Sequence, residues 1–314
     1  MIHEAQSRAD SMLLRELGRS GVRIPELGLG THDYHSGPGP LQRGLESGAL
    51  FIDTAESYGT EAVVGEAVRG VRNRVFIATK VSPEHYRARD LRASADGSLI
   101  RLGVDTIDLL QLHHPNPAIP ISETMDALSS LIDAGKVRFC GVSNFSVAEL
   151  RDAQNACGRH PIVSNQVRYN LLDRSIEENG LLEYCQQSGV AVIAYSPLAR
   201  SVSRILDCDA LGIISRIARE TGKTPAQIAI NWCLCKDGIL AIPKGSSTGH
   251  ILDNCGASDW RLTPEQIDLL DTSVHYRRHN RFDRLTRQWM PGPLQRMAVQ
   301  VSSFLPRSVR RRFT

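Results

Sequence analysis

Short apolar runs recur along the chain, and longer segments with apolar residues at helical spacing separate them. We expect a strand at each of eight runs, near residues 27–31, 50–54, 75–80, 107–113, 138–143, 163–167, 191–196 and 239–243. The runs contain few polar residues, which is typical of strands in a parallel sheet that is covered on both faces. Eight alternating strand–helix units in one chain predict an α/β fold, the (α/β)8 TIM barrel.

The segments between the runs have the spacing of amphipathic helices. Within residues 121–134, for example, Met125, Leu128 and Ile132 fall on one face. Two helical segments, 210–221 and 225–235, stand before the eighth strand and are therefore extra to the alternation. The remaining helices are predicted at 61–68, at 91–102 with Asp90 as N-cap, at 148–156 with Ser146 as N-cap, at 180–187, and from Pro264 onward.

Ahead of the first strand, residues 14–18 and 22–27 flank the turn Arg19-Ser20-Gly21 and predict a β-hairpin. An open, doubly wound sheet is the alternative to a barrel. Its dinucleotide-binding form carries the pattern G-x-G-x-x-G, but Gly28-Leu29-Gly30 is followed by Asp33 at the third glycine position. The sequence therefore favours the barrel.

Composition sets limits on the class of protein. Of 314 residues, 41% are hydrophobic and 23% are charged, as in ordinary globular chains. No apolar run reaches the roughly 18 residues of a membrane helix. We expect a flexible leader over residues 1–12 that is not a secretory signal, a barrel domain over 13–274, and a separate extension over 275–314. Seven cysteines without paired spacing indicate a reducing, cytoplasmic location.

Residues able to do chemistry stand at, or just after, consecutive strand ends. They are Asp53 with Tyr58, Lys80, His113, Ser143 with Asn144, Gln166, Tyr195 with Ser196, and Lys244. Each has a structural explanation when taken singly, such as a solvated lysine or a turn-capping asparagine. Because strand ends converge on one face of a barrel, their recurrence predicts a single site.

Four of these residues predict proton donation to a carbonyl oxygen. A tyrosine titrates near pH 10, and we expect the ammonium of Lys80 to lower the pKa of Tyr58. Asp53 would keep Lys80 charged and oriented, and His113 would hydrogen-bond a substrate oxygen or share the proton. This chemistry needs no cysteine, no Ser–His pair and no metal, so the nucleophile must come from elsewhere.

The other strand-end residues predict what that molecule is. Ser143, Asn144 and Gln166 can pair with a carboxamide, and Tyr195 can stack on a flat ring, as a nicotinamide requires. The segment 242–247, Ile-Pro-Lys-Gly-Ser-Ser, offers a cation and hydroxyls between a strand and a helix, where a phosphate would bind. We therefore expect a hydride-donating cofactor held without a Rossmann turn.

With these residues in place, the chain resembles the aldo-keto reductases from about residue 14 to residue 270. The motifs that carry the resemblance are LGRSG (17–21), LGLGTH (27–32), IDTAESYG (52–59), ATK (78–80), DLLQLHHP (108–115), GVSNF (141–145), SNQVRYN (164–170), AYSPLA (194–199) and IPKG (242–245). The resemblance implies a barrel closed at its base by the hairpin, and NADPH-dependent reduction of aldehydes or ketones.

The resemblance also implies a role for each matching residue. Tyr58 is the general acid, Lys80 and Asp53 tune it, and His113 orients the carbonyl. The implied cofactor-binding residues are Thr31, Asp53, Ser143, Asn144, Gln166, Tyr195, Ser196, Leu198, Lys244, Ser246, Ser247, His250 and Asn254.

Two departures from the family pattern bear on specificity. His250 stands where many relatives carry an arginine that clamps the 2′-phosphate, and a histidine lacks the bidentate fork. NADPH is expected through Lys244, Ser246 and Ser247, with NADH less excluded than usual. His114 replaces an aromatic residue, and with His32 and Tyr34 it predicts a polar substrate pocket that favours small polar carbonyl compounds.

The extension 275–314 is strongly basic. Its ten arginines and one acid, Asp283, sum to +9, so the other residues carry 3 minus 9, or −6. Relatives use this part of the chain as a substrate loop. Its apolar residues also suit binding to an anionic membrane surface or self-association. No nucleic-acid-binding module accompanies the charge, so we expect no nucleic-acid partner. We also expect the protein to be a monomer.

Two other functions remain open at the level of sequence. A regulatory subunit that keeps the cofactor as a sensor would share most of these residues, with slow turnover. A metal-dependent barrel hydrolase would need clustered ligands at strand ends, whereas the adjacent His113 and His114 are expected to point apart.

Overall fold

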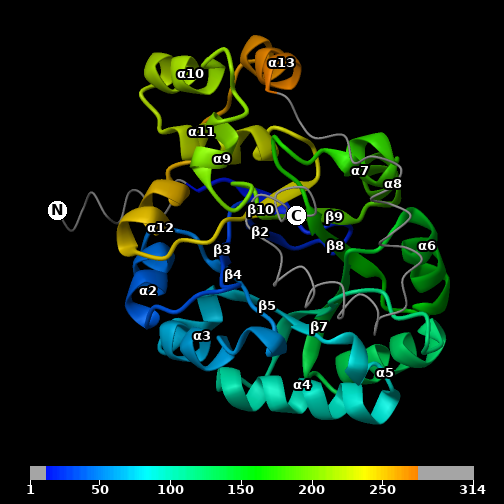
Figure 1. Ribbon diagram of the computed structural model, residues 1–314. Helices are drawn as coiled ribbons and strands as arrows, with labels where there is room; N and C mark the ends of the chain where they lie inside the picture. The colour runs from blue at the N-terminus through cyan, green and yellow to red at the C-terminus, as the bar shows by residue number, and fades with distance from the viewer. Residues whose placement is uncertain (1–11, 275–314) are drawn as a thin grey trace, which may run out of the picture. The chain divides into compact units, whose positions relative to one another are not determined.

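The computed structural model describes residues 12–274, and eight parallel strands form its centre (Figure 1). The strands pair in chain order, from β3 to β10. Backbone hydrogen bonds also join the two ends of the sheet, because Gly28 N donates to Ala241 O at 2.8 Å and Ala241 N donates to Glu26 O at 2.8 Å. The strands are β3 (Leu29–Gly30), β4 (Phe51–Asp53), β5 (Phe76–Val81), β6 (Ile107–Leu112), β7 (Val137–Ser143), β8 (Ile162–Arg168), β9 (Ala191–Tyr195) and β10 (Ile239–Ile242).

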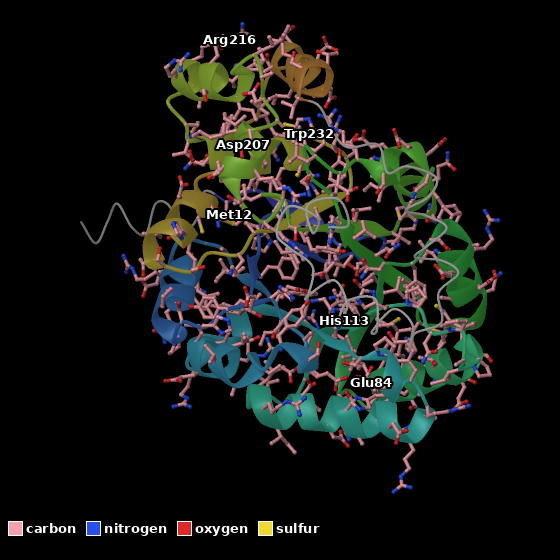
Figure 2. The ribbon with its side chains drawn as sticks, in the orientation of Figure 1. Met12, Glu84, His113, Asp207, Arg216 and Trp232 are labelled. Atoms are coloured by element: carbon pink, nitrogen blue, oxygen red, sulfur yellow. The ribbon has the colours of Figure 1, made fainter. Side chains whose placement is uncertain are left out.

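These eight strands confirm the predicted barrel, and helices surround it (Figure 1). The longer helices are α2 (Pro38–Glu46), α3 (Glu61–Val68), α4 (Ala88–Leu102), α5 (Ile121–Asp133), α6 (Val147–Ala156), α8 (Leu181–Ser188), α10 (Ile213–Thr221), α11 (Pro225–Leu234), α12 (Thr248–Cys255) and α13 (Pro264–Ser273). Short turns of helix are α7 (Ser175–Glu178), α9 (Val202–Leu206), η1 (Glu56–Tyr58), η2 (Arg72–Arg74) and η3 (Pro83–His85). The extra helices gather at one side of the ring, where Figure 2 labels Trp232 of α11.

Local sequence explains most helix ends. Ser146 caps α6 in a capping box with Glu149, as its position before the helix predicts. The prediction of Asp90 as the N-cap of α4 was wrong, because the helix begins at Ala88 and Asp90 lies in its first turn. The amide of Ala88 is satisfied instead by the carboxylate of Glu123, at 3.1 Å.

The hairpin of β1 (Leu14–Glu16) and β2 (Arg23–Pro25) is antiparallel, as predicted. Its apolar residues Leu17 and Ile24 are buried in one cluster with Phe51 and Phe76, which begin β4 and β5. The hairpin thus closes the amino-terminal end of the barrel. At the opposite end the strands terminate, and this is the end at which barrel enzymes carry their active sites.

No helix within residues 12–274 combines the length and the apolar composition that crossing a bilayer requires. Residues 1–11 of the predicted leader and the whole basic extension lie outside the described residues. Met12, the last residue of the predicted leader, is buried in the core.

Candidate active site

A cavity of about 550 Å³ lies at the carboxyl ends of the strands. His113, labelled in Figure 2, directly follows β6 and is one of its lining residues. Four lining residues that the sequence analysis missed are Asp33, Arg168, Arg200 and Ser201. The predicted site residues that line the cavity are Thr31, His32, Asp53, Tyr58, His113, His114, Ser143, Asn144, Gln166, Tyr195, Ser196, Leu198 and Lys244.

Lys80 is fully buried and forms an ion pair with Asp53, whose carboxylate lines the cavity. Its Nζ donates to Asp53 Oδ1 at 2.5 Å and to the carbonyl of Thr54 at 2.8 Å. The second carboxylate oxygen accepts from Gln166 Nε2 at 2.7 Å and from Gln111 Nε2 at 3.3 Å. A buried charge pair is tolerated only when its remaining hydrogen bonds are satisfied, and here both partners meet that condition.

Tyr58 is held over this ion pair. Lys80 Nζ lies 4.9 Å from the centre of the phenol ring, and the hydroxyl lies 3.4 Å from His113 Nε2. Tyr58 ends η1, and Gly59 follows in the left-handed region at φ 69°, where glycine is favoured. The hydroxyls of Thr60 and Thr54 then form a hydrogen bond, with their Oγ1 atoms 2.8 Å apart. Both ends of the Tyr58 turn are therefore fixed to the residues at the end of β4.

The pKa of Tyr58 shifts in the direction opposite to the one predicted. Burial raises the pKa of Tyr58 well above its ordinary value, and the charge of Asp53 adds to the effect. The predicted lowering of this pKa by Lys80 was wrong, because burial of the phenol dominates the shift. Burial, with Lys80 second, lowers the pKa of His113 to about 3. At neutral pH the site therefore holds a protonated phenol beside a neutral imidazole.

The raised pKa of Tyr58 and the lowered pKa of His113 predict a rate of carbonyl reduction that does not change with pH near neutrality. His113 stays neutral at any pH well above 3, and Tyr58 keeps its proton up to at least about pH 10. We expect kcat to be constant between about pH 6 and pH 9, measured with a small aldehyde at saturating cofactor. A twofold or greater loss centred near pH 6.5 would contradict the neutral assignment of His113.

The carboxamide-pairing residues form one connected group. Asn144, at φ 63°, donates from Nδ2 to Ser143 Oγ at 3.0 Å and to the carbonyl of His113 at 3.1 Å. Its Oδ1 accepts from the hydroxyl of Tyr195 at 3.0 Å. Amide and hydroxyl groups therefore stand beside an aromatic ring in the cavity, and this donor set fits a nicotinamide.

The residues predicted to bind the phosphate and the adenine lie on α12 and on the segment just before it. Ser247 caps this helix by accepting from the amide of His250 at 3.2 Å, and Asn254 bonds to the carbonyl of Lys244 at 3.4 Å. Of this group only Lys244 lines the cavity, while Ser246, Ser247, His250 and Asn254 do not. Lys244 Nζ lies 3.1 Å from the carbonyl and 3.7 Å from the carboxylate of Asp33.

Three further residues are placed differently from their sequence expectations. Tyr34 does not line the cavity, because it is buried in the core with its hydroxyl bonded to the carbonyl of Gly37 at 2.8 Å. His113 and His114 do not point apart, since their rings stack with centroids 4.9 Å apart. Within the described part of the chain, no three metal-ligating side chains come together.

The chain is similar in sequence to known proteins. The profile of the Aldo/keto reductase family matches residues 40–275. Methylglyoxal reductase YeaE of Escherichia coli is 34% identical over 262 residues, covering 80% of this chain and 91% of that protein. The 9,11-endoperoxide prostaglandin H2 reductase of Trypanosoma cruzi is also 34% identical, covering 80% and 88%.

Solved structures agree with these matches. The thermostable aldo-keto reductase Tm1743, in complex with the inhibitor epalrestat, is 38% identical with a TM-score of 0.77 and covers 83% of this chain and 99% of its own. An aldo/keto reductase from Klebsiella pneumoniae in complex with NADP and acetate is 34% identical with a TM-score of 0.76, covering 86% and 98%.

Proposed function

The chain belongs to the aldo/keto reductase family, and we propose that it reduces small polar aldehydes or ketones with NADPH, using Tyr58 as the proton donor. As a member of this family it is an oxidoreductase of carbonyl compounds. The observation that carries the assignment of roles is the Tyr58 hydroxyl, 3.4 Å from His113 Nε2 and above the buried Lys80–Asp53 pair.

NADPH, when bound, supplies the hydride that adds to the carbonyl carbon. The neutral imidazole of His113 can donate one hydrogen bond to the carbonyl oxygen, which orients and polarises it. As negative charge develops on that oxygen, Tyr58 gives up its proton, because an alkoxide is a stronger base than a phenolate. The ammonium of Lys80 then faces the newly formed phenolate at close range and stabilises it in a site of low dielectric.

The proposed cofactor contacts follow the geometry of the cavity. Ser143, Asn144 and Gln166 pair with the carboxamide, and Tyr195 stacks on the ring. Thr31, Asp53, Ser196 and Leu198, which line the same cavity, contact the part of the cofactor between the nicotinamide and the adenosine. Lys244, Ser246, Ser247, His250 and Asn254 bind the adenosine part. His32 and His114 face the substrate.

His250 is the proposed neighbour of the 2′-phosphate. Replacing it by arginine supplies a bidentate cation at an exposed position, so His250→Arg should raise the ratio of Kd for NADH to Kd for NADPH by about tenfold. Fluorescence titration with both cofactors measures this ratio. An unchanged ratio would reject the placement of His250, and Arg216→Lys on α10 provides a remote control.

Reductase activity separates this function from its alternatives. The relatives named above are reductases and give no support to a regulatory subunit. With purified protein and NADPH, we expect turnover of a panel of small aldehydes, undiminished by a metal chelator. Cofactor binding without turnover of any carbonyl compound would contradict the proposal, and loss of activity in the chelator would favour a metal enzyme.

Location and assembly are part of the same proposal. All seven cysteines are free thiols, which supports the proposal that the protein is located in the reducing cytoplasm. We propose a monomer, with the basic extension contributing to the substrate site, to membrane association or to self-association.

A further inference from the structure

Arg168 is the last residue of β8, and it brings a positive charge to the active-site cavity. It follows Gln166 by two residues, so both side chains stand on the same face of the strand. The residue is half-buried, and its Cζ lies 5.7 Å from the centre of the Tyr195 ring, within the range of a cation–π contact. The Tyr195 ring thus helps to hold the guanidinium in place.

The guanidinium of Arg168 has no acidic partner among the described residues. Within residues 12–274 it makes neither a hydrogen bond nor an ion pair. Asp33 and Asp53, the acids among the described lining residues, each have another cation beside them. Asp53 bonds to Lys80 at 2.5 Å, and the Asp33 carboxylate lies 3.7 Å from Lys244 Nζ. The five N–H donors of Arg168 are therefore available to a ligand.

The neighbours of Arg168 place it at the nicotinamide end of the proposed cofactor site. Arg168 pairs in register with Tyr195 of β9, and the Tyr195 hydroxyl donates to Asn144 Oδ1 at 3.0 Å. In the proposed function Tyr195 stacks on the nicotinamide ring, while Asn144 and Gln166 pair with its carboxamide. This end of the cofactor carries no phosphate. An anionic group that meets Arg168 therefore belongs to the substrate.

The other polar side chains that face the substrate carry little charge. Burial lowers the pKa of His32 and of His114, and both imidazoles are therefore largely neutral at pH 7. They can form hydrogen bonds with a substrate, but they cannot offset a negative charge. Arg200 also lines the cavity, but it is exposed whereas Arg168 is half-buried. A carboxylate interacts more strongly with Arg168, because water screens the exposed charge of Arg200.

We propose that Arg168 binds a carboxylate of the substrate, so that the enzyme prefers aldehydes or ketones with an acidic group over neutral ones of similar size. This inference rests on the proposed function, since it takes carbonyl reduction as the reaction. A guanidinium binds a carboxylate through two parallel N–H···O bonds, which orient the substrate and add affinity. Held at one end by Arg168, the substrate presents its carbonyl group to Tyr58 and His113.

The test compares acidic aldehydes with their own methyl esters, using the full-length protein at saturating NADPH. The acids are 4-oxobutanoate, 5-oxopentanoate and 6-oxohexanoate, whose different lengths allow for the span between Arg168 and Tyr58. Each acid has the same aldehyde group as its ester and nearly the same size, and the two differ in charge. We expect kcat/KM to be about 10- to 100-fold higher for at least one acid than for its ester, mainly through a lower KM.

Variants of Arg168 assign this preference to the arginine. Arg168→Gln should lower kcat/KM for the preferred acid by about 10- to 100-fold and change that for its ester by less than about threefold. Arg168→Lys keeps the charge but loses the planar fork, so its kcat/KM for the acid should lie between those of the wild type and Arg168→Gln. Arg204→Gln, an exposed arginine on α9 outside the cavity lining, should leave both substrates unaffected. Kd for NADPH should be unchanged in all three variants.

Each of the following results would overturn the inference. If no acid is preferred over its ester, Arg168 does not bind a substrate carboxylate. If Arg168→Gln raises Kd for NADPH by about tenfold or more, the arginine contacts the cofactor. If Arg200→Gln removes the preference and Arg168→Gln does not, the carboxylate binds at the loop after β9. If the wild-type protein reduces neither the acids, nor the esters, nor methylglyoxal, the proposed function itself fails, and this result is distinct from the other three.

Discussion

Replacing Tyr58 by phenylalanine is expected to lower kcat/KM for carbonyl reduction by about 10²- to 10⁴-fold, the usual contribution of a positioned general acid. The substitution removes the hydroxyl that lies 3.4 Å from His113 Nε2. It keeps the ring that packs edge-on against His32 and whose centre lies 4.9 Å from Lys80 Nζ. Kd for NADPH should therefore stay within a few-fold of the wild-type value.

Tyr34→Phe is the matched control for this prediction. Tyr34 also carries a buried phenol that follows a barrel strand, but its hydroxyl bonds to the carbonyl of Gly37 outside the cavity. We expect reductase activity within about twofold of the wild type. A large loss of NADPH binding in Tyr58→Phe, or retained activity, would mean that Tyr58 does not donate the proton.

The second large effect concerns Lys80. Lys80→Met leaves the carboxylate of Asp53 buried without a counter-ion, and breaking such a pair costs about 3–5 kcal/mol of the free energy of unfolding. It also removes the cation that stabilises the Tyr58 phenolate. We therefore expect both a lower midpoint of urea unfolding and a kcat/KM reduced by at least about 100-fold.

A double variant separates these two effects. Lys80→Met combined with Asp53→Asn removes both charges and keeps a side chain able to bond Gln166 and Gln111, so most of the stability should return. Catalysis should not return, because no cation faces Tyr58. Recovery of activity together with stability would show that Lys80 serves the fold alone.

The sequence predicted the barrel well because the signal was redundant. Each buried strand was apolar, and most strands were separated from the next by a segment with helical spacing. Helix α2 was missed, since Pro38, Gly39, Pro40 and Gly44 are typical of loops. Gly44 is explained by packing, because an added Cβ would approach side-chain atoms of Leu29 and Ile251 to 2.8 Å.

The sequence predicted the site residues that stand at strand ends. It predicted less well the site residues in loops, because the loop conformation decides where these residues lie. Alternation along β8 places Arg168 on the same face as Gln166, so periodicity could have found it. Arg200 could not be found in this way, because its place in the cavity depends on positive φ angles in the loop after β9. The direction of the Tyr58 pKa shift also needed the structure, since it depends on burial and on Asp53.

The role of Glu56 also could not be predicted from the sequence. As a carboxylate beside Tyr58 it could be taken for an acid catalyst. In the structure it accepts from the amide of Ser82 at 2.6 Å and from His85 Nδ1 at 2.9 Å, so it ties the Tyr58 turn to the segment after β5. Its role is to position the turn.

The most direct test of the central claim is a single turnover of bound NADPH. Enzyme in excess over NADPH is mixed with methylglyoxal or 4-nitrobenzaldehyde, and the absorbance of the reduced nicotinamide is followed with time. We expect rapid oxidation by the wild-type protein and a rate at least about 100-fold slower in Tyr58→Phe at equal cofactor occupancy. Bound NADPH that neither aldehyde oxidises in the wild-type protein would contradict the assignment as a carbonyl reductase.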